Sequence, residues 1–294
     1  MIRFSKLFPI YKYPIGFLKL LKAYYDYFDH PVINTKNPIF GGFLGLNGKQ
    51  SFLSSLRDKH KGERCFIIAN GPGLNKIDIS LLKDEITIGC NGIYKNFSKW
   101  EFNTNYYMIV DNVQIDIRAR EIAKLKGSVK FTGLHNSYSF PFFNDMNYFH
   151  VPLRSNMEYV GKELFPQFSN DIASIMFGGP TITYLMIQMA YHLGFSKIYL
   201  VGLDHNYGKL PELFPPGKIK VTKENYHLVQ ECHFDKDYYK IGDTLGVPNV
   251  KAQEKAYTTA KTFIESTGRE IINLSPDSKL NIFKKEDYDS LFKK

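Results

Sequence analysis

The stretch CFIIANGPGLN, residues 65–75, decides the fold because it joins a buried strand to a glycine-rich turn. The apolar run Cys65–Ala69 is typical of a strand that is covered on both faces. It stops at Asn70, Gly71, Pro72 and Gly73, whose small size leaves backbone N–H groups open to an anion or a ribose. An ordinary turn would have the same composition, and the spacing is neither G-x-G-x-x-G nor that of a P-loop.

Five more apolar runs repeat this strand pattern. The strand candidates are Cys65–Ala69, Ile86–Cys90, Tyr106–Val110, Val129–Thr132, Lys197–Val201 and Glu270–Asn273. Helical periodicity between them is clearest over Thr181–Leu193 and Val250–Thr267. Short apolar strands that alternate with helices predict an α/β domain, an open Rossmann-like, mostly parallel sheet with helices on both faces. Such a sheet binds ligands at the carboxyl ends of its strands. Residues 278–294 are expected to form a polar terminal helix.

The chain divides at about residue 60. Residues 1–60 are predicted to be an N-terminal arm, basic and aromatic, that becomes helical and then continues as a Gly-rich and Asn-rich loop; residues 61–294 are predicted to be the catalytic domain. Residues 1–30 are compatible with a basic amphipathic helix on an anionic membrane surface. An arm packed on the protein's own core would show the same pattern, and we favour this interpretation slightly.

Composition narrows the class of protein. The 294 residues are 44% hydrophobic, which excludes a disordered chain. The net charge of +9 favours an anionic partner, but it is spread along the chain, so we expect no nucleic-acid partner. Three cysteines without a C-x-x-C pair indicate a reducing cytosol. With no apolar stretch of about 18 to 20 residues and no signal peptide, we expect a cytoplasmic protein, free or peripheral at the inner face of the membrane.

Polar residues follow three consecutive strands at the point where each ends. Asn70 ends the first, Asn91 the second, and Asp111 with Asn112 the third. Each alone is typical of a cap or turn. Because parallel strands bring their carboxyl ends to one edge, the four side chains together predict a nucleotide site, in which Asn reads a base edge or a ribose hydroxyl.

The stretch FGGPTITYLMIQMAYHLGFSKIYLVGLDHNYG, residues 177–208, adds a second group of candidates. Its GGPT element opens a helix whose free N–H groups are available to a phosphate. The residues of this element are Gly178, Gly179, Pro180 and Thr181. The strand that follows ends at Asp204, His205 and Tyr207, where a carboxylate could orient an imidazole for acid-base work.

The segment ECHFDKDYY, residues 231–239, supplies a further histidine. His233 is a candidate general base, and the hydroxyls of Tyr238 and Tyr239 are candidates for binding a leaving phosphate. A surface loop with a solvated histidine is the alternative. The chain has no H-E-x-x-H motif and no paired C-x-x-C, so we expect a site without a metal.

The order of these motifs resembles a known family. NGPGL, GCNG, GGPT, IYLVGLDHNYG and HF, followed by AYTTAKTFIESTGREIINLSP, are similar to the family that groups archaeal 6-hydroxymethylpterin pyrophosphokinase-like domains with bacterial surface-polysaccharide and flagellin glycosyltransferases. The pattern is more distantly similar to Campylobacter-type sialyltransferases. The resemblance covers residues 62–275.

The resemblance implies a sialyltransferase-like variant of the GT-A fold and metal-independent, inverting transfer from a CMP-sugar, with no other cofactor. It implies that Asn70 and Gly71 meet the nucleotide phosphate or ribose, that Asn91 and Asn112 meet the ribose or base, and that Gly179–Thr181 line the cytidine pocket. It also implies that Asp204 sits at the next strand end and that His233 is the base.

The chain departs from the sialyltransferase pattern twice. His205-Asn206-Tyr207 replaces an aromatic pair, so Tyr207 is the candidate for the phosphate-binding hydroxyl and His205 stays a competing base. GGPT replaces a Thr-Ser-Gly element, which leaves the nucleobase open.

Three functions remain from the sequence. We favour a glycosyltransferase that builds a bacterial cell-surface glycan such as lipopolysaccharide, with a nucleotide-sugar donor and a glycan or glycolipid acceptor as partners. An ATP-dependent 6-hydroxymethylpterin pyrophosphokinase is the alternative, although that chemistry recruits Mg²⁺ through carboxylates and the strand ends offer more Asn than Asp. A non-enzymatic nucleotide-binding module is the third. A homo-oligomer is compatible with all three.

Overall fold

The computed structural model describes residues 49–140, 144–151, 157–160 and 163–293. Its centre is an eight-stranded sheet in the order β12-β11-β8-β1-β2-β3-β4-β5, in which every neighbouring pair is parallel. The strands are β1 (Arg64–Ile68), β2 (Thr87–Cys90), β3 (Tyr106–Ile109), β4 (Val129–Gly133), β5 (Met146–Phe149), β8 (Lys197–Val201), β11 (Glu270–Asn273) and β12 (Lys284–Lys285). All six predicted strands are present, so the predicted parallel α/β fold is confirmed.

The strand order reverses once, between β1 and β8. The chain runs outward from β1 through β5, and β8 then returns to the opposite side of β1, where Ile67 pairs with Leu200. The connections from β1 to β2 and from β8 to β11 therefore lead to opposite sides of the β1–β8 pair. A crevice at the carboxyl ends of two such strands is the usual ligand position in open α/β sheets.

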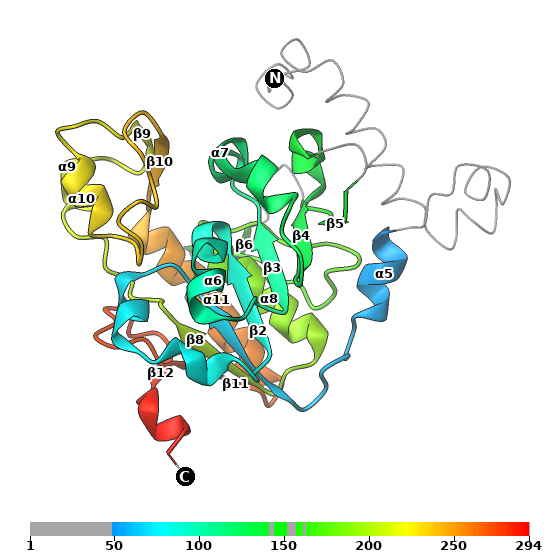
Figure 1. Cartoon of the computed structure of the whole chain (residues 1–294). Coiled ribbons are helices and arrows are strands. Elements are labelled where there is room, and N and C mark those ends of the chain that lie inside the picture. Colours follow the sequence, from blue (N-terminus) through cyan, green and yellow to red (C-terminus); the bar gives the residue numbers. More distant parts are fainter. Residues whose placement is uncertain (1–48, 141–143, 152–156, 161–162, 294) are drawn as a thin grey trace, which may run out of the picture.

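Helices surround the sheet (Figure 1). They are α5 (Lys49–Ser55), α6 (Phe97–Trp100), α7 (Asn112–Ile122), α8 (Ile182–Leu193), α9 (Leu210–Leu213), α10 (Tyr226–Gln230) and α11 (Val250–Ser266). Helix α8 packs on β1, β2 and β3, and α11 packs on α8 and β11. Ten of the twelve α8 side chains are buried, because the helix lies between the sheet and α11. The two clearest predicted helices are confirmed.

Short 3₁₀ helices follow several strands in place of long crossover helices. They are η1 (Pro72–Lys76), η2 (Ile79–Leu82), η3 (Asn91–Asn96), η4 (Leu134–Ser139) and η5 (Asp289–Leu291). Of these, η1 and η3 begin within four residues of the ends of β1 and β2. They therefore hold the Asn70 and Asn91 turns close to the carboxyl edge of the sheet.

Residues 202–249, between β8 and α11, extend beyond the sheet. They contain α9, α10 and an antiparallel hairpin of β9 (Gly217–Lys220) and β10 (Thr244–Val247). Figure 1 shows these four elements gathered in yellow to orange at one side of the molecule. A second small hairpin pairs β6 (Met157–Val160) with β7 (Glu163–Pro166).

The structure tests the prediction for the C-terminal end of the chain but only part of the prediction for the N-terminal end. The predicted helix over residues 278–294 is wrong, because β12 and η5 occupy this segment. Its apolar residues Leu280, Phe283 and Tyr288 are buried at a spacing that a helical face would also provide, but Lys284 and Lys285 between them pair with β11 at the sheet edge instead. The predicted membrane arm, residues 1–30, lies outside the described residues. The later residues of the 1–60 segment pack on the domain, since Leu53 is fully buried and its carbonyl lies 2.8 Å from His192 Nε2.

Among the described residues, no helix combines the length and the apolar character that a bilayer-spanning segment requires.

Candidate nucleotide site

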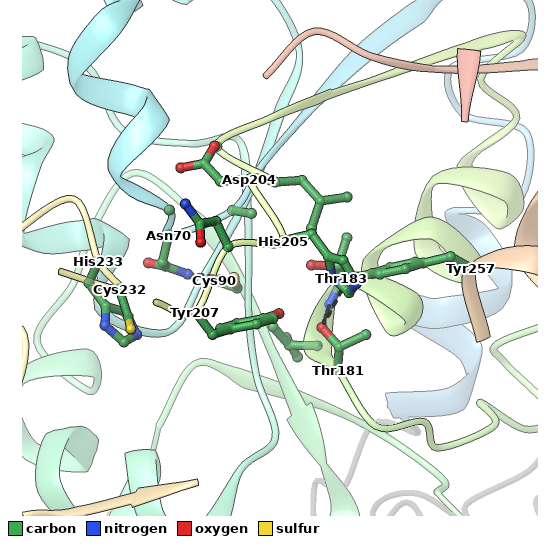
Figure 2. Close-up of a pocket in the computed structure, with 16 residues that line it drawn as sticks. Asn70, Cys90, Thr181, Thr183, Asp204, His205, Tyr207, Cys232, His233 and Tyr257 are labelled. Carbon is green, nitrogen blue, oxygen red and sulfur yellow. Dashed lines mark hydrogen bonds between the residues drawn. The ribbon is translucent and has the colours of Figure 1, made fainter. Parts of the chain in front are cut away.

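A pocket lies at the carboxyl ends of β1 and β8, at the point where the strand order reverses. Figure 2 shows its lining, with His233 and Cys232 on one side, Thr181, Thr183 and Tyr257 on the other, and Asn70 and Tyr207 between them. The lining residues are Ala69, Asn70, Gly71, Cys90, Thr181, Ile182, Thr183, Gly202, Leu203, Asp204, His205, Asn206, Tyr207, Cys232, His233 and Tyr257. Four separate predicted groups therefore meet in one place: the β1 turn, the start of α8, the end of β8 and the segment that carries His233.

The glycines of the β1 turn make room for the end of β8. The Gly71 N–H donates to Gly202 O at 2.9 Å, and the Gly73 N–H donates to Asp204 Oδ2 at 2.5 Å. A Cβ on Gly71 would lie 2.6 Å from both Gly202 O and Asp204 Oδ2, and one on Gly73 would also collide with the Asp204 carboxylate. The turn thus positions a carboxylate, and the Gly73 N–H is already used by that protein anion.

Asp204 is held in a nearly closed environment. Its side chain is 7% exposed, and burial raises its pKa, while the bond from the Gly73 N–H acts in the opposite direction. Asp204 Oδ1 is buried and has no hydrogen-bond partner among the described residues. One oxygen is therefore fixed by the turn and the other is an unused acceptor.

Asn70 lines the same pocket and carries a second unused acceptor. Its amide nitrogen donates to Cys90 Sγ at 3.1 Å, which fixes the orientation of the carboxamide. In the part of the chain that the structure describes, Asn70 Oδ1 is buried without a partner. Asn91 has the same feature at Oδ1, and its backbone is left-handed, with φ of 50°. Asn91 does not line the pocket.

His205 occupies a strained position at the end of β8. Its φ is 51°, a left-handed conformation that non-glycine residues rarely adopt. The side chain is 3% exposed, and neither ring nitrogen makes a hydrogen bond to a described residue. Nε2 lies 3.4 Å from Glu254 Oε1, an ion-pair distance without hydrogen-bond geometry. Burial lowers the pKa of His205, and the Glu254 carboxylate opposes that shift.

The start of α8 forms the wall opposite His233. Thr181 caps the helix, since its hydroxyl accepts from the Thr183 N–H at 3.4 Å. Tyr257, from α11, reaches the same hydroxyl at 3.4 Å. Gly178, Gly179 and Pro180 do not line the pocket. A Cβ on Gly179 would instead meet the Tyr184 ring at 2.6 Å, so this glycine allows α8 to pack.

His233 reaches the pocket from the segment after α10. Its ring stacks on Tyr238, with centroids 4.1 Å apart and planes 17° apart, and Nδ1 lies 3.5 Å from Val229 O. Burial lowers its pKa to about 4, so the imidazole is neutral at neutral pH. The hydroxyls of Tyr238 and Tyr239 accept from the Gly92 N–H at 3.1 Å and from Gln114 Nε2. Neither tyrosine lines the pocket.

Other predicted residues are placed elsewhere or already bonded. Asp111 and Asn112 are exposed at the end of β3, where Asp111 Oδ1 accepts from the Val113 N–H at 2.9 Å and caps α7. The Tyr207 hydroxyl donates to Gln253 Oε1 at 2.7 Å inside the pocket wall. Pro72 begins η1 behind the turn.

Sequence reasoning missed several lining residues. Thr183 and Tyr257 belong to helices whose facing sides the sequence does not reveal, although Thr183 lies two residues from the predicted Thr181. Cys90 and Cys232 also line the pocket, and burial raises their pKa values to about 12, so both are thiols.

The described residues contain no group of three or more His, Cys, Asp and Glu side chains that could hold a metal ion. Asp204 is the one carboxylate among the lining residues. The expected metal independence stays a prediction.

The pocket combines acceptors with a helix N-terminus. Asn70 Oδ1 and Asp204 Oδ1 need donors such as ribose or sugar hydroxyls, because an unpaired buried acceptor costs about 1–3 kcal/mol. The first turn of α8 brings a positive dipole end to the pocket, which suits a phosphate, although its Thr183 and Tyr184 N–H groups already donate to Thr181. Burial lowers the pKa values of His205 and His233, so both imidazoles are in the neutral form, which can accept a proton. This set suits a ligand that carries both hydroxyls and phosphate.

Comparison with known proteins gives one family and one distant structure. Residues 46–209, more than half of the chain, match the family described as 6-hydroxymethylpterin diphosphokinase MptE-like. Among solved structures, the chain is similar to the MAf glycosyltransferase from Magnetospirillum magneticum AMB-1, with 11% sequence identity and a TM-score of 0.47. The match covers 84% of this chain and 38% of that one, a likeness too distant to inform function. No curated protein matches the sequence.

Proposed function

The chain belongs to the 6-hydroxymethylpterin diphosphokinase MptE-like family, and from this membership and the geometry of the pocket we propose that it is a nucleotide-dependent transferase. The membership confirms the family resemblance in the motifs. The reaction we favour is transfer of a sugar from a nucleotide-linked donor, with CMP as the nucleotide, to a hydroxyl of a glycan or glycolipid.

One observation carries this proposal. Asn70 and Asp204 each carry a buried side-chain oxygen, Oδ1, without a partner among the described residues, and both residues line one pocket with the start of α8, where the strand order reverses. Ribose hydroxyls bonded to these oxygens would remove the cost of leaving them unpaired. The donor phosphate would then lie at the first turn of α8.

The same pocket offers a base for the acceptor hydroxyl. A hydroxyl group that attacks the sugar must lose a proton, and the neutral imidazole of His233 can take it. His205 is the competing base, since its ring also lines the pocket. We propose an inverting and metal-independent reaction, in which the positive N-terminal end of α8 stabilises the departing phosphate.

Diphosphate transfer from ATP to a pterin alcohol is the second candidate, favoured by the family's description. That reaction uses Mg²⁺ held by one or two carboxylates together with the phosphates. The lining supplies Asp204, one of whose oxygens already accepts from the Gly73 N–H. This donor set favours sugar transfer over diphosphate transfer.

The cellular setting is part of the proposal. We propose that the protein acts in the cytoplasm, at the inner face of the membrane, on a surface-glycan precursor, and that residues 1–30 hold it near that acceptor. The net charge of +9 suits an anionic surface.

Titration calorimetry against CMP, CDP, UDP, GDP and ATP, each with and without Mg²⁺, tests the proposal. We expect a cytidine nucleotide to bind without Mg²⁺, and we expect Asn70→Leu to weaken it about tenfold through loss of its hydrogen bond. The control Asn103→Leu changes an exposed amide that bonds to Lys126 O at the opposite edge of the sheet, and its affinity should be unchanged. ATP binding that requires Mg²⁺ would favour the kinase, and no nucleotide binding at all would contradict both candidates.

A further inference from the structure

Arg118 is a buried cation without a buried anion beside it. It lies on α7, is 2% exposed, and pairs with no carboxylate among the described residues. Its Nη2 donates to Tyr238 O at 2.5 Å, and its Nε has no partner within the described part of the chain. An isolated buried charge is costly, so a residue of this kind calls for an explanation.

Tyr238 connects this cation to the pocket. The Arg118 guanidinium carbon lies 4.8 Å from the centre of the Tyr238 ring, and that ring stacks on His233 at 4.1 Å. The Tyr238 hydroxyl is anchored by the Gly92 N–H at the end of β2. The residue after His233 is anchored as well, since the Phe234 N–H donates to Asn70 O at 3.0 Å.

These contacts hold His233 in place and set a positive charge close to it. We propose that Arg118 is a positioning residue, which holds the Tyr238 ring, and through it the His233 imidazole, at the pocket wall, and whose fixed positive charge disfavours protonation of that imidazole. The role of His233 as a base rests on the proposed function. The effect of the Arg118 charge on the pKa of His233 does not rest on that function.

The groups that face His233 shift its pKa in opposite directions. Burial is the largest cause of its lowered pKa, and the positive charge of Arg118 lowers it further. The hydrogen bond to Val229 O and the negative charge of Asp235 raise it. The remaining neighbours, Tyr238 and Tyr239, carry no charge at neutral pH because burial raises their pKa values. Arg118 is thus the cation that acts against protonation of His233.

The proton affinity of His233 can be measured directly on the nucleotide-free protein. Imidazole signals followed by NMR between pH 3 and pH 8 give the pKa of each histidine, and His233→Gln identifies the His233 signal by its loss. Arg118→Gln keeps a donor for Tyr238 O but removes the charge, whereas Arg118→Lys keeps the charge. We expect Arg118→Gln to raise the proton affinity of His233 about tenfold and Arg118→Lys to leave it close to wild type.

Lys95→Met is the matched control. Lys95 also lies near the Tyr238 ring, 6.0 Å from its centre, and donates to Asp237 O at 2.6 Å, but its charge is paired with Asp235 Oδ2 at 3.7 Å, whereas Arg118 pairs with no carboxylate among the described residues. This variant should shift the His233 titration much less than Arg118→Gln does. The Gly92 amide signal reports whether Tyr238 stays docked in each variant.

Two results would overturn the proposal. One is an unchanged His233 titration in Arg118→Gln, and the other is an equal rise in the Gln and Lys variants, which would mean that packing and not charge is responsible. If Arg118→Gln does not fold, the wild-type titration and Arg118→Lys still decide, because a His233 that titrates near its ordinary pKa would contradict the proposal. No turnover is measured, so failure of the proposed function would leave this result standing.

Discussion

His233→Gln is expected to slow sugar transfer by about 10²–10⁴-fold while it leaves nucleotide affinity within about twofold of wild type. Gln fills a similar volume and can keep a contact to Val229 O, but it cannot accept a proton at neutral pH. Since Asn70, Asp204 and the start of α8 are proposed to hold the nucleotide, binding should survive. Single-turnover kinetics with a saturating donor, compared with calorimetry, separate the two effects.

His205→Gln is the comparison that tests the assignment. His205 lies in the same pocket but next to Glu254, on a left-handed backbone position that Gln also has to adopt. We expect a smaller loss of turnover from this change. The assignment would be wrong if His205→Gln abolished transfer and His233→Gln left it unchanged.

The pH dependence of transfer follows from the same residue. A base with a pKa of about 4 is deprotonated throughout the range above it, and it loses activity as pH falls through that value. The part of kcat/KM that depends on His233 should therefore be flat between about pH 5 and 8 and fall below it. A fall centred near the ordinary histidine value would point to a different base.

Gly71→Ala is expected to destabilise the protein by about 1–3 kcal/mol and to abolish nucleotide binding. The new Cβ would lie 2.6 Å from the Gly202 carbonyl oxygen, a backbone atom that cannot rotate away. Relief requires the ends of β1 and β8 to separate, which breaks the bond from the Gly71 N–H to Gly202 O and displaces Asp204. Thermal unfolding and calorimetry measure the two losses.

Gly246→Ala controls for the general effect of adding a methyl group. Gly246 is on β10, and a Cβ there would meet no atom within 4 Å. Its effect on stability should stay within about 0.5 kcal/mol, with nucleotide binding unchanged. A Gly71→Ala protein that binds nucleotide as the control does would remove the turn from the proposed site.

Local patterns predicted the sheet because each central strand is buried on both faces. Runs such as Cys65–Ala69 and Lys197–Val201 are almost wholly apolar, and their polar ends necessarily share one edge in a parallel sheet. The reversal between β1 and β8 then brought Asn70 and Asp204 into one pocket. This part of the site could be predicted.

Side-chain partners could not be predicted in the same way. The glycines after β1 were interpreted as room for a ligand, yet a Cβ at either position would meet the carboxylate of Asp204, more than 130 residues later in the sequence. Tyr257 reaches the pocket through helix packing, and Arg118 stands out only once its burial is known. Such facts depend on tertiary contacts that leave no periodic signal.

A crystal structure of the protein soaked with CMP tests the central claim most directly, because it locates the nucleotide. The account predicts ribose hydroxyls within hydrogen-bond distance of Asn70 Oδ1 or Asp204 Oδ1 and the phosphate at the first turn of α8. A nucleotide bound away from the carboxyl ends of β1 and β8, or a pocket that stays closed to CMP at saturating concentration, would contradict it.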